Sequence, residues 1–222
     1  MSKRPGQTGV SVVAFHPSPY LVDHVDRLFA ELAPPGCDVA NVVIPDLLDR
    51  ASNGVTPVIS GEIRNVLADL DGSPVVLCTC STLGGSAERI GAELGVRVVR
   101  IDRPMAENAV EVGGKVGLVA AAPSTLKPTR DLLEEVAVDA GSHIDIEEVV
   151  IESAWALNQT GDVVGYLTEC ERVVRNRAPE FDVVVLAQGS MAEVASRCSD
   201  LATPILASPR SGVERILKLA GQ

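Results

Sequence analysis

One short segment of the sequence gathers residue types that could do chemistry: residues 78–85 read CTCSTLGG. The segment follows the apolar run 74–77, so a strand is expected to end near Cys80 and a helix to begin there. A helix N-terminus presents unpaired N–H groups and a partial positive charge, which lower the pKa of a nearby thiol and favour the thiolate. Such a thiol could act as a general acid or base, or as a nucleophile. Cys80 is therefore the candidate catalytic residue, whereas Cys78, inside the strand, is expected to be a small buried residue.

Sequence motifs for metals and cofactors are absent. No G-x-G-x-x-G follows the first apolar run, so the phosphate-binding turn of a dinucleotide fold is missing. The histidines His16, His24 and His143 are scattered, and Cys78-x-Cys80 has no second pair at the spacing of a zinc site. We expect a protein that uses no metal and no cofactor.

Short apolar runs alternate with amphipathic stretches along the whole chain. Eight runs rich in Val, Ile and Leu are predicted to be buried strands: 10–15, 39–44, 74–80, 96–101, 116–121, 144–151, 182–188 and 204–207. Apolar residues at spacings of three and four predict helices at 20–32 and 129–140. This alternation predicts an α/β fold with doubly wound parallel sheets and helices on both faces.

The two halves of the sequence repeat each other. Segment 10–18 corresponds to 116–124, 42–44 to 149–151, 75–77 to 184–186, and Pro104 to Pro209, so the features recur after 105 to 109 residues. The repeat predicts two pseudo-symmetric lobes with four-stranded parallel sheets, one made of 1–104 plus 211–222 and the other of 105–210. The carboxyl ends of their strands would face a shared interlobe cleft, where open α/β sheets bind ligands.

The duplicated architecture and the segment Cys80-Ser81-Thr82 resemble the aspartate/glutamate racemase superfamily, which includes hydantoin racemase, maleate isomerase and arylmalonate decarboxylase. That family typically has a Cys-Asn-Thr motif in the first lobe and a second cysteine motif in the other. Aligning the third strands of the halves places Gly189-Ser190-Met191 opposite Cys80-Ser81-Thr82, so Gly189 stands where the second cysteine would be. The resemblance implies a cofactor-independent racemase or isomerase that acts next to the carboxylate of a small substrate, and it implies a homo-oligomer.

The absence of a second cysteine leaves several reactions open. In the family, two thiols exchange the proton of the reacting carbon from opposite faces, which Cys80 alone could not do. Ser190, Gln188 or His16 could act on the second face. Alternatively, Cys80 could protonate one face of the carbanion left by decarboxylation of a malonate, or add to an activated double bond. A carboxylate-binding protein without catalysis and a flavodoxin-like nucleotide or flavin binder are further alternatives.

Polar groups near the strand ends are candidates for binding the carboxylate and for stabilising an enediolate-like intermediate. The candidate substrate-binding residues are His16, Ser81, Thr82, Ser124, Thr125, Gln188 and Met191. Each Ser or Thr among them could equally be a helix N-cap. Arg103 and Arg210 follow the fourth strands and could hold a second carboxylate or lie on the surface. Trp155 is expected to be a packing or rim residue.

Charge and cysteine content exclude other classes of protein. The chain of 222 residues has a formal net charge of −11, so it lacks the basic balance of nucleic-acid-binding proteins. Five cysteines are an odd number and do not indicate a disulfide framework. No apolar run has the length of a membrane span and no secretory leader is recognisable. We expect a cytoplasmic protein with reduced thiols and a small carboxylate as its partner.

Overall fold

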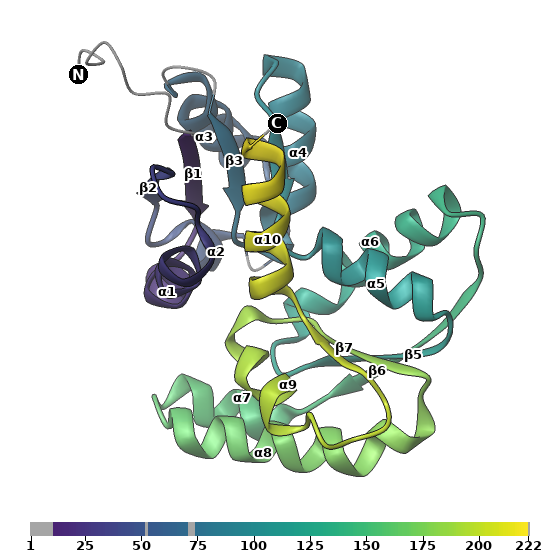
Figure 1. The fold of residues 1–222 in the computed structure, drawn as a ribbon. Helices are drawn as coiled ribbons and strands as arrows, with labels where there is room; N and C mark the ends of the chain where they lie inside the picture. Colours follow the sequence, from purple (N-terminus) through teal and green to yellow (C-terminus); the bar gives the residue numbers. More distant parts are fainter. Residues whose placement is uncertain (1–10, 52, 71–73, 222) are drawn as a thin grey trace.

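The computed structural model describes residues 11–51, 53–70 and 74–221, and its strands form two separate four-stranded parallel sheets (Figure 1). The first sheet has the order β2-β1-β3-β4, with β1 (Ser11–His16), β2 (Asp38–Val43), β3 (Val75–Cys78) and β4 (Val98–Arg100). The second sheet has the order β6-β5-β7-β8, with β5 (Gly114–Ala120), β6 (Ile144–Val150), β7 (Val183–Leu186) and β8 (Ile205–Ala207). The second order repeats the first, so the predicted fold class is confirmed. We call each sheet with its covering helices the first and the second lobe.

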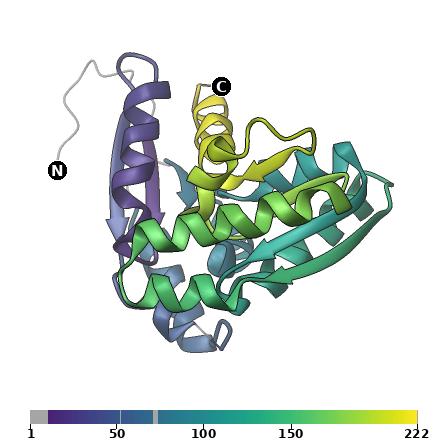
Figure 2. The same cartoon turned by 90° about the horizontal axis from the view of Figure 1, so that it is seen from below.

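Helices cover both faces of each sheet. Those before β5 are α1 (Val22–Leu32), α2 (Leu47–Arg50), α3 (Pro57–Ala68), α4 (Ser81–Leu94) and α5 (Arg103–Val112). Those after β5 are α6 (Leu126–Asp139), α7 (Glu152–Gln159), α8 (Val163–Arg177), α9 (Ala192–Arg197) and α10 (Ser208–Ala220). In Figure 1, α5 and α6 lie on one side of the second sheet and α8 and α9 on the other, and Figure 2 shows α7 and α8 in front.

The strands are apolar on both sides because both sides are buried, as in other parallel sheets. Each sheet has a separate cluster of buried side chains on each of its two faces. All four residues of β7 are buried, and three of the four in β3. Burial of these aliphatic side chains, at roughly 25 cal/mol per Å² of apolar surface, is the main force that holds each lobe together.

The chain passes between the lobes twice. After β4 it enters α5, whose Met105 and Ala106 lie in the core of the second lobe. After β8 it returns through α10, whose Val213 and Ile216 lie in the core of the first lobe. The last helix in the sequence, α10, therefore covers the first sheet, although it follows the strands of the second sheet.

Element boundaries differ from the predicted ones at the ends that face the cleft. The predicted strand 74–80 ends at Cys78, and the predicted strand 182–188 ends at Leu186. A 3-10 turn, Pro19–Leu21, precedes α1, and a second one, Pro123–Thr125, precedes α6. Val10, which began the first predicted strand, lies outside the described residues. No helix in the described part of the chain is long and apolar enough to cross a membrane.

Candidate active site

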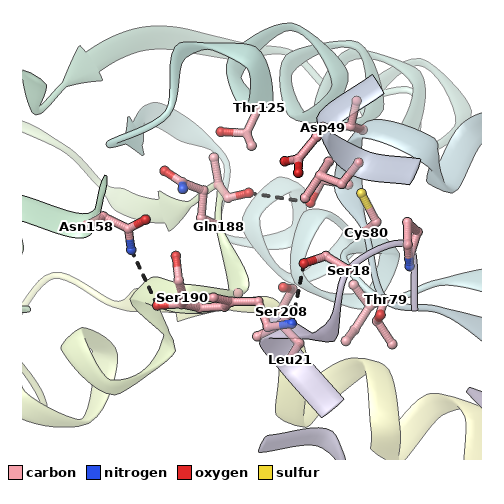
Figure 3. Close-up of a pocket in the computed structure, with 18 of the residues that line it drawn as sticks. Ser18, Leu21, Asp49, Thr79, Cys80, Thr125, Asn158, Gln188, Ser190 and Ser208 are labelled. Carbon is pink, nitrogen blue, oxygen red and sulfur yellow. Dashed lines mark hydrogen bonds between the residues drawn. The ribbon is translucent and has the colours of Figure 1, made fainter. Parts of the chain in front are cut away.

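A cavity of about 260 Å³ lies between the lobes where the carboxyl ends of the two sheets meet (Figure 3). Segments that follow all eight strands contribute to its lining, from Ser18 after β1 to Ser208 after β8. A ligand in this cavity would therefore contact both lobes. This is the position at which parallel α/β sheets bind their ligands.

Cys80 lies on the wall of this cavity as the N-cap residue of α4. Its backbone is extended (φ −138°, ψ 122°), and its side chain is 8% exposed. An N-cap side chain can accept hydrogen bonds from the N–H groups two and three residues later, here those of Thr82 and Leu83. The Cys80 side chain makes no such capping hydrogen bond in this structure. A thiolate at Cys80 would be a much better acceptor for these bonds than the neutral thiol.

The protonation of Cys80 differs from the prediction. Burial raises the pKa of the Cys80 thiol above its usual value, and the N–H groups of Leu83 and Thr82 oppose this rise only in part. The negative charge of Asp102 raises the pKa further. The predicted lowering by the helix N-terminus was therefore wrong in its net direction, because desolvation outweighs the helix end. The neutral thiol is the resting form of Cys80 near neutral pH.

The other cysteines lie away from the cavity. Cys78 is fully buried in the core of the first lobe, and its thiol lies 3.9 Å from the carbonyl oxygen of Cys80. Cys170 and Cys198 are buried in the core of the second lobe, and burial raises the pKa of Cys170 to about 12. Cys37 is half-buried after α1. None of these four lines the cavity.

The strand pairing corrects the predicted alignment of the halves by one residue. Cys78 ends β3 beside Phe15 as Leu186 ends β7 beside Val119, and Cys80 and Gln188 are the extended N-cap residues two positions later. Gln188, and not Gly189, therefore corresponds to Cys80, and Gly189 lies next to it on the cavity wall.

A Cβ atom at residue 189 would lie 2.6 Å from Cδ1 of Leu21, a separation that real atoms avoid. Leu21, from the turn before α1, therefore fills the space that a side chain at 189 would need. The position where the family resemblance implies a thiol therefore holds the amide of Gln188, and an aliphatic group fills the space next to it.

Gln188 and Ser190 flank this glycine and line the cavity (Figure 3). The Oε1 atom of Gln188 accepts hydrogen bonds from the N–H groups of Ala121 and Ala122, each at 2.7 Å. These contacts fix the orientation of the amide, and its NH2 group remains as a donor. The Ser190 hydroxyl lies 2.8 Å from the phenol oxygen of Tyr166, which is buried.

Hydroxyl groups of the two helix starts complete the polar part of the wall. Ser81 and Thr82 line the cavity beside Cys80, and the Ser81 hydroxyl donates to the carbonyl oxygen of Ala187 in the second lobe at 3.4 Å. Thr125 lines the opposite side and donates to the carbonyl oxygen of Ala122 at 2.8 Å. The described lining residues include no Lys, Arg or His, and Asp49 is their one ionisable carboxylate. An anionic ligand would be held here by neutral donors.

Three predicted binding residues lie outside the cavity. His16 is fully buried, and its ring nitrogens lie 3.1 Å from Oδ1 of Asn41 and 3.0 Å from Oγ1 of Thr79. Burial lowers the pKa of His16, so it is a neutral residue that links strand ends inside the first lobe. Ser124 is exposed and borders a different groove. Met191 is buried in the core of the second lobe.

The backbone of Met191 is also engaged, since its N–H donates to the carbonyl oxygen of Gln188 at 3.0 Å. The two arginines considered as carboxylate ligands are paired elsewhere. Arg103 binds Glu88 and Glu135, and Arg210 binds Glu31. Neither arginine lines the cavity.

Several lining residues have no signal in the sequence. Leu21, Asp49 and Asn158 come from turns or short helices that carry no motif, and only the fold brings them to the cavity. Trp155 was expected to be either a packing residue or a rim residue. It lines the cavity and also packs on the core of the second lobe. Asn158 lies 3.4 Å from the Tyr20 hydroxyl, so this pair joins the lobes at the cavity.

Comparison with protein-family models and with curated proteins found no match to this sequence. Solved structures do match. An aspartate racemase from Picrophilus torridus has a TM-score of 0.68 at 16% identity, over 96% of this chain and 94% of that one. An allantoin racemase from Klebsiella pneumoniae has a TM-score of 0.65 at 18% identity, over 96% and 88%.

A third similar structure is a glycine-to-cysteine mutant of arylmalonate decarboxylase with an associated sulfate ion. Its TM-score is 0.55 at 15% identity, over 95% of this chain and 93% of that one. The coverage of all three spans both lobes. The chain therefore has the fold of these solved structures, which is the fold that the resemblance to the aspartate/glutamate racemase superfamily implies.

Proposed function

We propose that this protein is a cofactor-independent enzyme related to the racemases and isomerases of this superfamily, and that it acts at the carbon next to a carboxylate of a small substrate. The observation that carries the proposal is the position of Cys80, a thiol at the start of α4 on the wall of the interlobe cavity. A thiol there can give a proton to the carbon or, as thiolate, take one from it. A small carboxylate is the proposed partner.

Neutral donors would supply the stabilisation that the carbon acid needs. Removal of a proton next to a carboxylate leaves an enediolate-like intermediate, whose oxygens carry the negative charge. Donors already directed at those oxygens stabilise this charge without rearranging. We assign this role to the hydroxyl of Thr82 and to the NH2 group of Gln188, which come from different lobes.

Decarboxylation with protonation from one face is a second candidate, and Leu21 favours it. The position that corresponds to Cys80 is Gln188, and Leu21 fills the space beside the next residue, Gly189. The face opposite Cys80 therefore has an amide and an aliphatic wall but no thiol. In this reaction the bond to one carboxyl group breaks, CO2 leaves, and the electron pair stays on the carbon. The neutral thiol of Cys80 then donates its proton to that carbon, and solvent returns a proton to the thiolate. The raised pKa of Cys80 suits this donor role.

Proton NMR in D2O tests both candidates with one panel of substrates. The panel contains free amino acids, hydantoins, maleate and substituted malonates. Racemisation predicts exchange of the α-proton for deuterium with loss of optical activity. Decarboxylation predicts one deuterium per product and a single enantiomer. Loss of a carboxyl group from a prochiral malonate with formation of an optically active product would decide for the second candidate.

The matched variants are Cys80→Ala and Cys37→Ala. We expect Cys80→Ala to lower turnover by about a thousandfold or more, because the proton-transfer group is lost. Cys37→Ala changes a thiol outside the cavity and should retain full turnover. Full turnover in Cys80→Ala would contradict the proposal. Ligand-induced stabilisation without conversion of any substrate would instead indicate a binding protein.

A further inference from the structure

A buried arginine that this mechanism does not use lies against the first turns of α4. Arg100 is 4% exposed, and its Nε and Nη2 atoms bind the two carboxylate oxygens of Asp102 at 2.6 and 2.9 Å. Asp102 is fully buried. Taking such a pair out of water is costly unless its other hydrogen-bonding groups are also used. The remaining contacts of the guanidinium therefore indicate what the pair does.

Those contacts join two helix starts that border the cavity. Nη2 of Arg100 lies 3.2 Å from the carbonyl oxygen of Ser81 and 3.3 Å from that of Pro128. Ser81 follows Cys80 directly and is the first residue of α4. Pro128 is in the first turn of α6, three residues after Thr125. One side chain of the first lobe thus connects the helix that Cys80 caps to the second lobe.

The glycine pair of the CTCSTLGG segment makes room for this side chain. A Cβ atom at residue 84 would lie 2.7 Å from Cβ of Arg100, which is closer than real contacts allow. A Cβ atom at residue 85 would lie 3.5 Å from Nη1 of Arg100, an ordinary van der Waals contact. Gly84 is therefore needed where Arg100 crosses α4, whereas Gly85 is not.

We propose that Arg100 is a positioning residue for Cys80, which holds the first turn of α4 so that the N–H groups of Thr82 and Leu83 face the thiol. Arg100 also neutralises Asp102, whose uncompensated charge would disfavour a thiolate in the same region. The inference rests on the proposed function only in taking Cys80 as the reacting group. Its test follows the thiol itself and needs no substrate.

The test measures alkylation of each cysteine by iodoacetamide between pH 7 and pH 10, with peptides resolved by mass spectrometry. Arg100→Lys keeps the charge but loses the planar fork that reaches Asp102 and both carbonyls. We expect the alkylation rate of Cys80 at a fixed pH to fall about fivefold or more, since one pKa unit changes the thiolate fraction about tenfold. The rate of Cys37 should stay unchanged and serves as an internal reference.

Arg103→Lys is the matched control. Arg103 also bridges the lobes, through Glu88 and Glu135, but it has no hydrogen bond to Ser81. Cys80 of the Arg103→Lys variant should be alkylated at the same rate as Cys80 of the wild type. An unchanged Cys80 rate in Arg100→Lys, or an equal loss in Arg103→Lys, would overturn the proposal. The proposal would also be overturned if Cys80 of the wild-type protein were alkylated no faster than the buried Cys78.

If Arg100→Lys does not fold, the buried Cys78 and Cys170 will be alkylated rapidly. A second pair of variants then tests the role of Arg100. Gly84→Ala should slow Cys80 alkylation, and Gly85→Ala should not, although both add one methyl group to the same helix. Equal effects of the two substitutions would refute the role of Arg100. If no substrate is ever turned over while these rates behave as expected, the proposed function fails and the positioning role stands.

Discussion

Cys80 combines burial with access to a cavity, and this combination sets its chemistry. Its thiol is desolvated by the protein, which raises its pKa, yet it faces space that a small molecule can enter. The resting state is therefore a proton donor. A thiolate forms at Cys80 only when a substrate or a higher pH removes the proton, and the N–H groups of Thr82 and Leu83 then become its partners.

The face opposite Cys80 offers a prediction about stereochemistry. In the double variant Leu21→Ala/Gly189→Cys, a second thiol gains the space that Leu21 now fills. We expect this variant to protonate both faces, so that a product which is a single enantiomer in the wild type becomes racemic, as chiral chromatography would show. Gly189→Cys alone should give less racemisation, because its side chain must displace Leu21.

Leu21→Ala alone is the control, since it opens the same space without adding a thiol. It should keep the product enantiomerically pure. Racemic product from Leu21→Ala alone would mean that solvent, and not a second thiol, reaches the open face. Removal of this half-buried side chain should cost no more than about 2 kcal/mol of stability, at the low end for leucine truncation.

Site residues could be predicted from the sequence where their place depends on neighbouring residues along the chain. Cys80 could be found because it follows an apolar strand and precedes a helix. Its counterpart in the other half was predicted one residue too late, at Gly189 instead of Gln188, because valine-rich strands do not fix their own register.

Leu21 and Asp49 could not be predicted, because their proximity to the site depends on how the two lobes meet. His16 was misplaced because a histidine at a strand end can point to the cleft or into the lobe, and here its ring lies against Thr79 and Asn41 inside the first lobe.

At the scale of elements, the close approach of α10 to the turn after β4 gives a prediction about stability. Gly212 of α10 lies against the first lobe, where an added Cβ would be 2.5 Å from the carbonyl oxygen of Ile101. Because that neighbour is backbone, Gly212→Ala should destabilise the protein by about 2 kcal/mol or more. Urea unfolding measures this change.

Gly61→Ala is the matched substitution in another helix. No atom lies within 4 Å of a Cβ at residue 61 of α3, so only helix propensity changes there. The free energy of unfolding should rise by up to about 1 kcal/mol. A similar loss of stability in both variants would contradict the assigned contact between α10 and Ile101.

Element types were predictable from apolar periodicity, and element ends were not. All eight predicted strands are present because a buried parallel strand needs a continuous apolar run. The strand before Cys80 stops two residues early because Cys80 caps α4 and no longer pairs with a neighbouring strand. Periodicity cannot locate such a change, since it depends on which residue begins the helix.

For the whole molecule, the buried thiols predict how stability varies with pH. Burial raises the pKa of Cys78, Cys80 and Cys170 in the folded state, whereas the unfolded chain has ordinary thiols. Above about pH 9 the unfolded state therefore releases protons that the folded state keeps. The stabilisation is complete below that pH and is lost as the pH rises toward the folded-state values.

We expect the free energy of unfolding, measured in urea with a reductant, to fall by about 1 kcal/mol or more between pH 9 and pH 11. Cys78→Ala should be less sensitive to pH over this range, because it removes a fully buried thiol. A stability that rises with pH here, or an unchanged slope in Cys78→Ala, would contradict this account.

The packing of α5 and α10 supports our proposed division into 1–104 plus 211–222 and 105–210. Helix α5 contributes to the second core and α10 to the first. The two lobes were predictable from the repeat, but the side-chain bridges between them were not. The contacts of Arg100 with Ser81 and Pro128 join segments that no pattern in the sequence relates.

The double passage of the chain between the lobes has a mechanical consequence. One passage lies between Ile101 and Met105, and the other lies between Ala207 and Val213. Ile101 and Ser208, which belong to these passages, line the cavity. We expect two covalent connections beside the cavity to favour rotation of the lobes about one axis and to oppose twisting or sliding. Rotation about that axis would change the opening most where the lobes have no covalent link, at the Tyr20–Asn158 pair. The cavity would then open and close mainly at the end where this pair lies.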